Sequence, residues 1–249
     1  DIKDSTYLLT SVPPTQSKRV LIEEATGVHC ANCPAGTALV GNLKVTHPDR
    51  IVATAVFSPL LNYVQSPSKY DFNSNDALSL VTMLGGDPAK PTAAIDRLET
   101  GSAYPYFFDL TTWAGTVTTE LTKTTPVNLD LQIAPTGNTD QYRLKTVMTF
   151  TDTLTADLNL SVYLLEDQVI DYQDSLGVPI LNYLHDHILR TILTPLPGSS
   201  VLSPTNSHEK GRVSEKTITF TLPKAVMVNG FPQGIVDKTH LKLAVFIHK

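Results

Sequence analysis

The two cysteines of this 249-residue chain, Cys30 and Cys33, lie in the stretch EEATGVHCANCPAG with two residues between them. Two sulfurs at this spacing at the start of a helix can close a small disulfide ring, and the N–H groups of the helix end stabilise a thiolate on the first of them. Cys30 would then attack a substrate disulfide, and Cys33 would resolve the mixed disulfide. This chemistry requires that one sulfur be reachable from water.

Two other interpretations use the same pair. A permanent disulfide would lock the loop to the helix and do no chemistry. A metal is the third interpretation: one C-x-x-C lacks two of the four ligands of a zinc site, although two thiolates with a further His or Met could hold Cu(I). Haem attachment needs C-x-x-C-H, and Pro34 follows Cys33 instead. We therefore expect no metal and no cofactor.

The segments around the cysteines spell strand, helix, strand. Residues 18–25 contain the compact apolar run Val20 to Ile22, which is typical of a short buried strand. From Pro34 to about residue 46 apolar residues recur at helical spacing, and proline suits the first turn of a helix. Residues 50–57 are a second buried-strand run. A connection of this kind predicts the βαβ unit of a parallel sheet.

Further helices and strands are predicted before the hydrophobic pattern changes to a period of two. After an irregular segment at residues 58–72, the patterns predict a helix at 75–84, a strand at 92–96 and a helix at 110–123 that is capped by Asp109. These elements give the first part of the chain an α/β character.

From about residue 125 the pattern alternates with a period of two. The runs VNLDLQI, YRLKTVMTF, LNLSVYLLE, HILRTIL, KTITFTL and HLKLAVFI read as strands with no helix between them, which indicates an antiparallel β-sandwich. The sequence therefore predicts a lead segment at residues 1–17, an α/β domain at 18–124 and an all-β sandwich domain at 125–249.

Composition narrows the class of protein. Hydrophobic residues make up 41% of the chain and charged residues 17%, as in a folded globular protein, and the net charge of −5 without any Lys/Arg cluster argues against a nucleic-acid partner. The polar, proline-containing beginning of the chain suggests an exported protein whose signal or lipoprotein segment is absent from this sequence. Export is compatible with either a redox-active or a permanent disulfide.

The order of these elements resembles the thioredoxin fold, and the resemblance implies roles for further residues. Such proteins carry a cis-proline beside the cysteines, usually before a strand that begins with Thr, and Pro91 and Thr92 match that place. They often keep a buried acid six positions before the first cysteine, where Glu24 stands, and this acid moves protons if burial raises its pKa. Alternatively Glu24 points to solvent while Glu23 points to the core, or either one is salt-bridged.

A closer match exists to the outer-membrane-protein-28-related family. The stretches VLIEEATGVHCANCPAG, KPTAAIDR, YLHDHILRTIL and LKLAVFIHK are similar to members of this family, which are cell-envelope proteins of Gram-negative bacteria with a thioredoxin-like part and a β-rich C-terminal part. The resemblance implies a location in the periplasm or at the outer membrane, with a lipid anchor as one form of attachment. Two departures are Lys90 before the proline, where an aromatic or small residue is expected, and Pro34 after the cysteines.

Two functions from different classes follow. The first is thiol–disulfide exchange through Cys30 and Cys33, with Glu24 and Pro91 completing the site and Lys90, Thr92 and His29 contacting the substrate. Its partners would be protein or peptide thiols and disulfides, and other envelope proteins. The second is a non-enzymatic envelope binding or adhesion protein in which the disulfide is structural.

Two histidines in the stretch YLHDHILR are candidates for a separate metal site. His185 and His187 would project from one face if both lay on a strand, so they form a conceivable metal pair. A structural role on a sandwich strand is the favoured interpretation.

Overall fold

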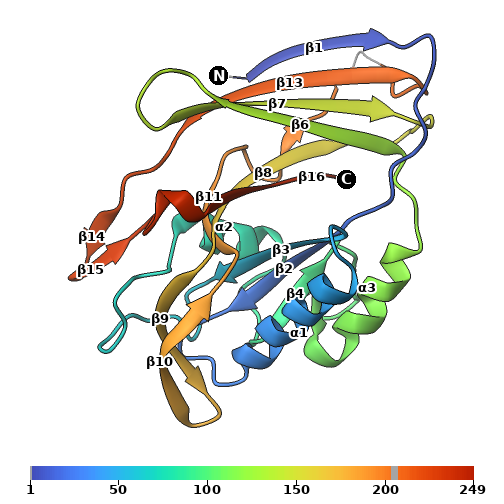
Figure 1. The fold of residues 1–249 in the computed structure, drawn as a ribbon. Helices are drawn as coiled ribbons and strands as arrows, with labels where there is room; N and C mark the ends of the chain where they lie inside the picture. Colours follow the sequence, from blue (N-terminus) through green and yellow to red (C-terminus); the bar gives the residue numbers. More distant parts are fainter. Residues whose placement is uncertain (1, 203–206) are drawn as a thin grey trace.

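The computed structural model describes residues 2–202 and 207–249, and strands dominate it (Figure 1). The helices of this described part are α1 (Cys33–Thr46), α2 (Asn75–Met83) and α3 (Trp113–Leu121), with short 3-10 helices η1 (Leu110–Thr112) and η2 (Lys238–His240). The strands of the first half are β1 (Ile2–Leu8), β2 (Val20–Thr26), β3 (Ile51–Phe57), β4 (Thr92–Ile95), β5 (Phe107–Asp109), β6 (Val127–Pro135) and β7 (Gln141–Phe150). Those of the second half are β8 (Asn159–Glu166), β9 (Val169–Ser175), β10 (Val178–His185), β11 (Ile188–Ile192), β12 (Ser199–Ser200), β13 (Arg212–Thr221), β14 (Val226–Val228), β15 (Phe231–Gln233) and β16 (Leu241–His248).

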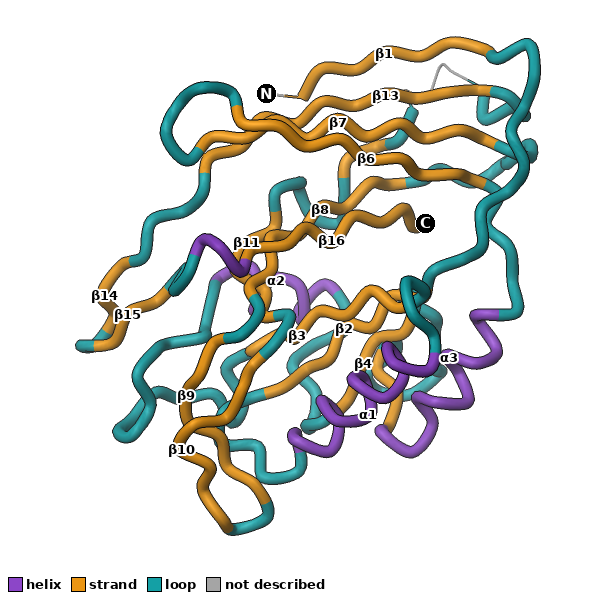
Figure 2. Tube along the Cα trace, viewed as in Figure 1, coloured by secondary structure: helices purple, strands orange, loops and turns teal. Residues whose placement is uncertain are grey.

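An eight-stranded sheet runs through the middle of the molecule in the order β12-β8-β11-β3-β2-β4-β5, with β16 on the outer edge of β8. Strands β2 and β3 are parallel and joined by α1, as the sequence predicts, while β4 runs antiparallel to β2. Alternate side chains of β2 point to opposite faces. One face packs against α1 and α3 through Ile22 and Trp113, and the other packs against α2 through Ala25 and Leu80 (Figure 2).

A second, four-stranded antiparallel sheet has the order β1-β13-β7-β6. It lies over the β8 and β16 end of the large sheet, so that Met148 and Phe150 of β7 and Ile218 of β13 meet Leu160 and Val162 of β8 in one apolar core. The two sheets are stacked as the layers of a sandwich, and this part of the molecule carries strands and loops rather than helices (Figure 2).

The expectation of a separate sandwich in residues 125–249 needs correction. Strands β8, β11, β12 and β16 belong to the sheet that also holds β2 to β5, because β11 pairs in parallel with β3 and antiparallel with β8. The boundary expected between residues 124 and 125 is therefore not a break between sheets. A period of two identifies a strand but does not say which strand it will pair with.

Two local expectations also differ from the structure. Within the expected lead segment 1–17, strand β1 pairs over its whole length with β13, although its sequence is mostly polar and exposed. The expected helix at 110–123 begins as the 3-10 turn η1, and the side chain of Asp109 makes no capping hydrogen bond there. Instead the Thr112 hydroxyl donates to the Asp109 carbonyl oxygen.

We expect the packing of β11 between β3 and β8 to be essential for stability. Ile188 of β11 is 0% exposed and packs beside β3, whereas Ile170 of β9 is 49% exposed. Replacing Ile188 with Ala should lower the free energy of unfolding by about 2–5 kcal/mol, and Ile170→Ala should change it by less than about 0.5 kcal/mol. Denaturant unfolding of both variants checks this, and equal effects would contradict the placement of β11 in the core.

Candidate functional site

Cys30 and Cys33 form a disulfide at the beginning of α1, with their Cα atoms 5.3 Å apart. Cys33 is the first residue of the helix, and its N–H donates to the Cys30 carbonyl oxygen at 3.1 Å. Pro34 occupies the first turn, as the sequence predicts. The helix end therefore holds the two sulfurs where its unpaired N–H groups would favour a thiolate once the bridge is opened.

Both cysteines are buried, each being only 1% exposed. The expectation that one sulfur is reachable from water is therefore wrong for this structure. The cause is the hairpin β9–β10, which the sequence pattern does not predict and which extends past the cysteine loop (Figure 1). The disulfide thus sits in a closed site.

Strand β9 is fixed directly to the backbone of the cysteine loop. The N–H groups of Asp174 and Leu176 donate to the carbonyl oxygens of Val28 and Ala31 at 2.8 and 3.0 Å. The amide of Gln173 adds hydrogen bonds to the carbonyl oxygens of Gly27 and Cys30. The loop and β9 are therefore joined edge to edge, and β10 is the outer strand of the pair.

His29 helps to hold the hairpin in place. Its ring stacks on Tyr63 with the centroids 4.0 Å apart, and its Nδ1 lies 3.0 Å from Asp174 Oδ2 on β9. Its other ring nitrogen, Nε2, is buried and has no hydrogen-bond partner among the described residues. His29 thus contacts the covering hairpin, and its expected contact with a substrate stays a prediction.

Glu24 lies beneath the first turn of α1. Its carboxylate is buried and accepts a hydrogen bond from the Thr37 hydroxyl at 3.5 Å. A Cβ added at Gly36 would lie 2.7 Å from Glu24 Oε1 and 3.2 Å from Pro91 Cβ, so the glycine allows all three segments to meet. Burial raises the pKa of Glu24 from 4.5 to about 8, which leaves the carboxyl group protonated at neutral pH.

Glu23, the neighbouring acid, has a structural role. Arg97 donates to both of its carboxylate oxygens at 3.0 Å, and the Tyr163 hydroxyl donates at 2.9 Å. Of the alternatives that the sequence left open, the structure has both acids buried, with Glu23 salt-bridged and Glu24 in no salt bridge with any residue that the structure describes. The expected role of Glu24 in proton transfer stays a prediction.

Pro91 lies near the cysteine helix, and the Lys90–Pro91 peptide bond is cis. The Lys90 ammonium turns away into the loop at residues 58–60, where it donates to the carbonyl oxygens of Ser58 and Leu60. Burial lowers the pKa of Lys90 to about 8. The Thr92 hydroxyl donates to the Ala89 carbonyl oxygen at 2.9 Å. These side chains serve the fold, and a substrate contact through the backbone at this point stays a prediction.

Tyr183 of β10 lies near the first turn of α1. Its side chain is half-buried, and burial together with the nearby Glu24 carboxyl group raises the pKa of the phenol. Strand β10 therefore approaches this part of α1 through Tyr183.

The residues that flank the hairpin, just before β9 and just after β10, contact each other and α1. Asp167 precedes β9 and His187 follows β10, and His187 Nδ1 lies 2.9 Å from Asp167 Oδ1. Lys44 of α1 contacts His187 Nε2 at 2.9 Å. Burial alone would raise the pKa of Asp167, but hydrogen bonds from His187 and Lys242 outweigh it and hold the value well below its usual range. The hairpin is thus anchored at its base as well as along β9.

His185 and His187 do not share an ion site. His185 lies in the core, where its Nε2 is 3.1 Å from the Tyr172 carbonyl oxygen and burial lowers its pKa to about 4. His187 lies outside β10 and binds Asp167. No cluster of three or more metal-ligating side chains occurs in the described ranges 2–202 and 207–249.

Comparisons with known proteins place the chain in a family. A sequence model of the family described as outer membrane protein Omp28 matches residues 86–236, more than half of the chain. The match begins after the cysteines and includes Pro91 and the β9–β10 hairpin. No curated protein matches the sequence. None of the helices that the structure describes is long and apolar enough to span a membrane.

Two solved structures share the fold. HBP35 of Porphyromonas gingivalis superposes with a TM-score of 0.66 at 18% sequence identity, over 93% of this chain and 69% of that one. Protein AGR_C_4864 from Agrobacterium tumefaciens has a TM-score of 0.50 at 12% identity, over 93% of this chain and 95% of its own. At these identities the similarity concerns the fold alone.

The buried Glu24 carboxyl predicts a pH-dependent stability. Its pKa is higher in the folded protein than in the unfolded chain, so its contribution to the free energy of unfolding is fully present below pH 4.5 and is lost as pH rises toward about 8. Glu24→Gln stays neutral and should lack this loss. Its stability relative to wild type should therefore increase by up to roughly 1.4 kcal/mol per pH unit across this window.

Unfolding measured at several pH values between these limits checks the prediction. Glu99→Gln provides the matched control, because it makes the same replacement at an exposed position. A constant difference between Glu24→Gln and wild type would show that Glu24 titrates normally.

Proposed function

Because the chain belongs to the outer membrane protein Omp28 family, we propose that it works in the cell envelope as a thiol–disulfide exchanger whose Cys30–Cys33 disulfide lies under a covering hairpin. The partners proposed are protein or peptide thiols and disulfides. A position facing the periplasm or attached to the outer membrane is part of this proposal, and attachment by a lipid stays a prediction.

A thioredoxin-like arrangement of the first half supports the proposal. Strands β3, β2, β4 and β5 are neighbours in that order, with β2 and β3 parallel and β4 reversed. Helices α1 and α3 pack on one face and α2 on the other. We therefore propose residues 18–124 as a thioredoxin-like unit whose sheet is extended by strands from residues 125–249, with residues 1–17 joining it to β13.

The observation that carries the proposal is the buried Glu24 carboxyl group, which lies under the cysteine helix without a salt bridge to any of the described residues. An unpaired buried carboxyl group is costly to the fold, and a purely structural disulfide has no need of it. Exchange does need it, because a thiolate leaves when the disulfide is attacked and must be protonated. Gly36 lies three residues after Cys33 in α1, and a Cβ added there would lie 2.7 Å from Glu24 Oε1, so the carboxyl group lies beside the turn of the helix that follows Cys33.

The exchange that we propose is balanced in atoms and electrons. A thiolate of a substrate dithiol attacks Cys30 Sγ, the Cys30–Cys33 bond breaks, and Cys33 leaves as a thiolate that takes the proton of Glu24. The second substrate thiol loses its proton to the Glu24 carboxylate and attacks the substrate sulfur of the mixed disulfide. The Cys30 thiolate leaves, the substrate is oxidised to a disulfide, and the cysteine pair is reduced by two electrons. The same steps in reverse reduce a substrate disulfide.

A second function is favoured by the burial of the bridge. Both cysteine residues are 1% exposed, and the covering β9 strand is hydrogen-bonded to the loop on either side of Cys30. These features also suit a non-enzymatic envelope binding or adhesion protein with a structural disulfide. The two functions differ in whether the cover can move while the protein stays folded.

Removing a large side chain of the covering hairpin tests this difference. If the hairpin guards an exchangeable disulfide, Tyr183→Ala should speed reduction of the bridge by dithiothreitol about tenfold, as ~1.4 kcal/mol of lost cover would. The half-exposed Tyr7 of β1 is the matched control, and Tyr7→Ala should leave the rate unchanged. The rate is followed by alkylation of the released thiols and mass spectrometry under native conditions.

The opposite outcome selects the second function. If the bridge of Tyr183→Ala is reduced no faster than that of wild type, and both require denaturant, the disulfide is a structural link. An insulin-reduction assay on Tyr183→Ala, with Cys30→Ser as the inactive reference, then should show no turnover.

A further inference from the structure

A slot with a volume of about 320 Å³ opens between the two sheets, far along the chain from the cysteines. This volume is at the lower end of the ~300–1,000 Å³ typical of small-molecule sites. We define the apolar slot by five of its lining residues, which are Leu131 and Ile133 of β6, Phe220 of β13, and Leu241 and Leu243 of β16; Lys238 of η2 also lines it.

Strand β6 shows that the sheets separate at the slot. The side chains on its inner face become more exposed along the strand: Val127 is 4% exposed, Leu131 is 45% exposed and Ile133 is 56% exposed. Ile133 nevertheless belongs to the inner face, since it pairs with the buried Leu144 of β7. Inner faces of a sandwich are normally filled by opposing side chains. Here β16 does not reach them, and an apolar gap remains.

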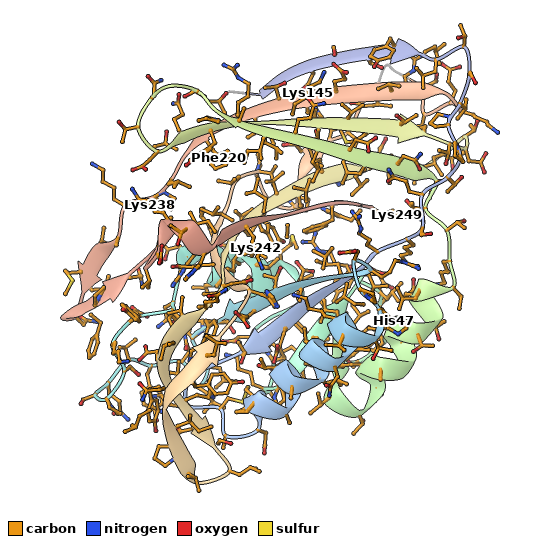
Figure 3. The ribbon with its side chains drawn as sticks, in the orientation of Figure 1. His47, Lys145, Phe220, Lys238, Lys242 and Lys249 are labelled. Carbon is orange, nitrogen blue, oxygen red and sulfur yellow. A yellow bond between two sulfur atoms is a disulfide. The ribbon has the colours of Figure 1, made fainter. Side chains whose placement is uncertain are left out.

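The charged residues at the slot are both cationic. Lys238 and Lys242 are the two charged side chains among its lining residues, and Figure 3 labels them below Phe220 of the upper sheet. The Lys238 ammonium is 2.6 Å from Asp140, in the turn between β6 and β7, and its side chain is 57% exposed. An exposed pair of this kind contributes only about 0–1 kcal/mol, so another anion can replace Asp140.

We propose that the slot binds the hydrocarbon chain of a fatty acid, with the carboxylate at Lys238. The aliphatic walls match an alkyl chain. The exposed ammonium group of Lys238 complements one anionic group, whereas the Lys242 ammonium group is held by Asp167. An uncharged chain would gain the apolar contacts alone, and a purely ionic ligand would leave the exposed faces of Leu131 and Ile133 uncovered. The occupant is therefore an amphiphile with one negative end.

Binding is measured with 11-(dansylamino)undecanoic acid, whose fluorescence rises in an apolar site. The wild-type protein should bind it saturably, and dodecanoate should displace it. Ile133→Asp should weaken binding at least tenfold, and the milder Leu131→Gln should act in the same direction. Ile170, a similarly exposed isoleucine on β9, is the matched control, and Ile170→Asp should bind as wild type does.

The role of Lys238 is tested by comparing the affinities of the protein for dodecanoate and for dodecanol. Wild type should bind dodecanoate more tightly than dodecanol, and Lys238→Gln should lose this preference while keeping its affinity for the alcohol. Lys224→Gln, at an exposed position outside the slot, should keep it. Absence of saturable binding, equal weakening in Ile170→Asp, or an unchanged preference in Lys238→Gln would overturn the proposal. So would a wild-type dimer in light scattering that Ile133→Asp dissociates, because a second copy of the chain would then be the occupant.

Discussion

The pairing of β11 with β3 on one side and β8 on the other is the constraint on which the rest of the structure depends. It joins strands from distant parts of the chain into one sheet, and the His187 carbonyl oxygen just before β11 accepts a 2.7 Å hydrogen bond from Ala55 of β3. The hairpin β9–β10 immediately precedes β11 in the sequence. Fixing β11 beside β3 therefore brings the hairpin to the end of the sheet where the cysteine loop lies.

The closed site follows from that placement. Once β9 lies beside the cysteine loop, its N–H groups find partners in the loop carbonyls, and Gln173 and His29 add side-chain bonds between the two segments. Glu24 lies apart from these bonds, under α1 beside Gly36 and Pro91, where burial raises the pKa of its carboxyl group. The covering hairpin closes the disulfide, so exchange at the disulfide requires that the hairpin open.

Local patterns were sufficient for part of this arrangement. Apolar runs at residues 20–22 and 50–57 predicted β2 and β3, and the helical spacing after Pro34 predicted α1, with small errors in the ends of these elements. The resemblance to the thioredoxin fold, in turn, predicted that Glu24 and Pro91 lie beside the helix. The hairpin was missed because its hydrophobic pattern is inverted: Asp171 and Gln173 of β9 are buried by hydrogen bonds to loops, while Val178 and Leu181 of β10 face solvent. Its turn also has Leu176 where Asn usually accompanies glycine at positive φ. The partners of Glu23 and of β11 lie far away in sequence, so no local signal specifies them.

The reduction potential of the Cys30–Cys33 pair, measured by equilibration of the native protein with defined ratios of reduced and oxidised glutathione or dithiothreitol, tests the central claim most directly. An exchanger under a movable cover should have a potential between about −120 and −270 mV, the range of known thiol–disulfide exchange proteins. A potential below about −300 mV, typical of structural disulfides in secreted proteins, would contradict the account and leave the bridge as part of the fold.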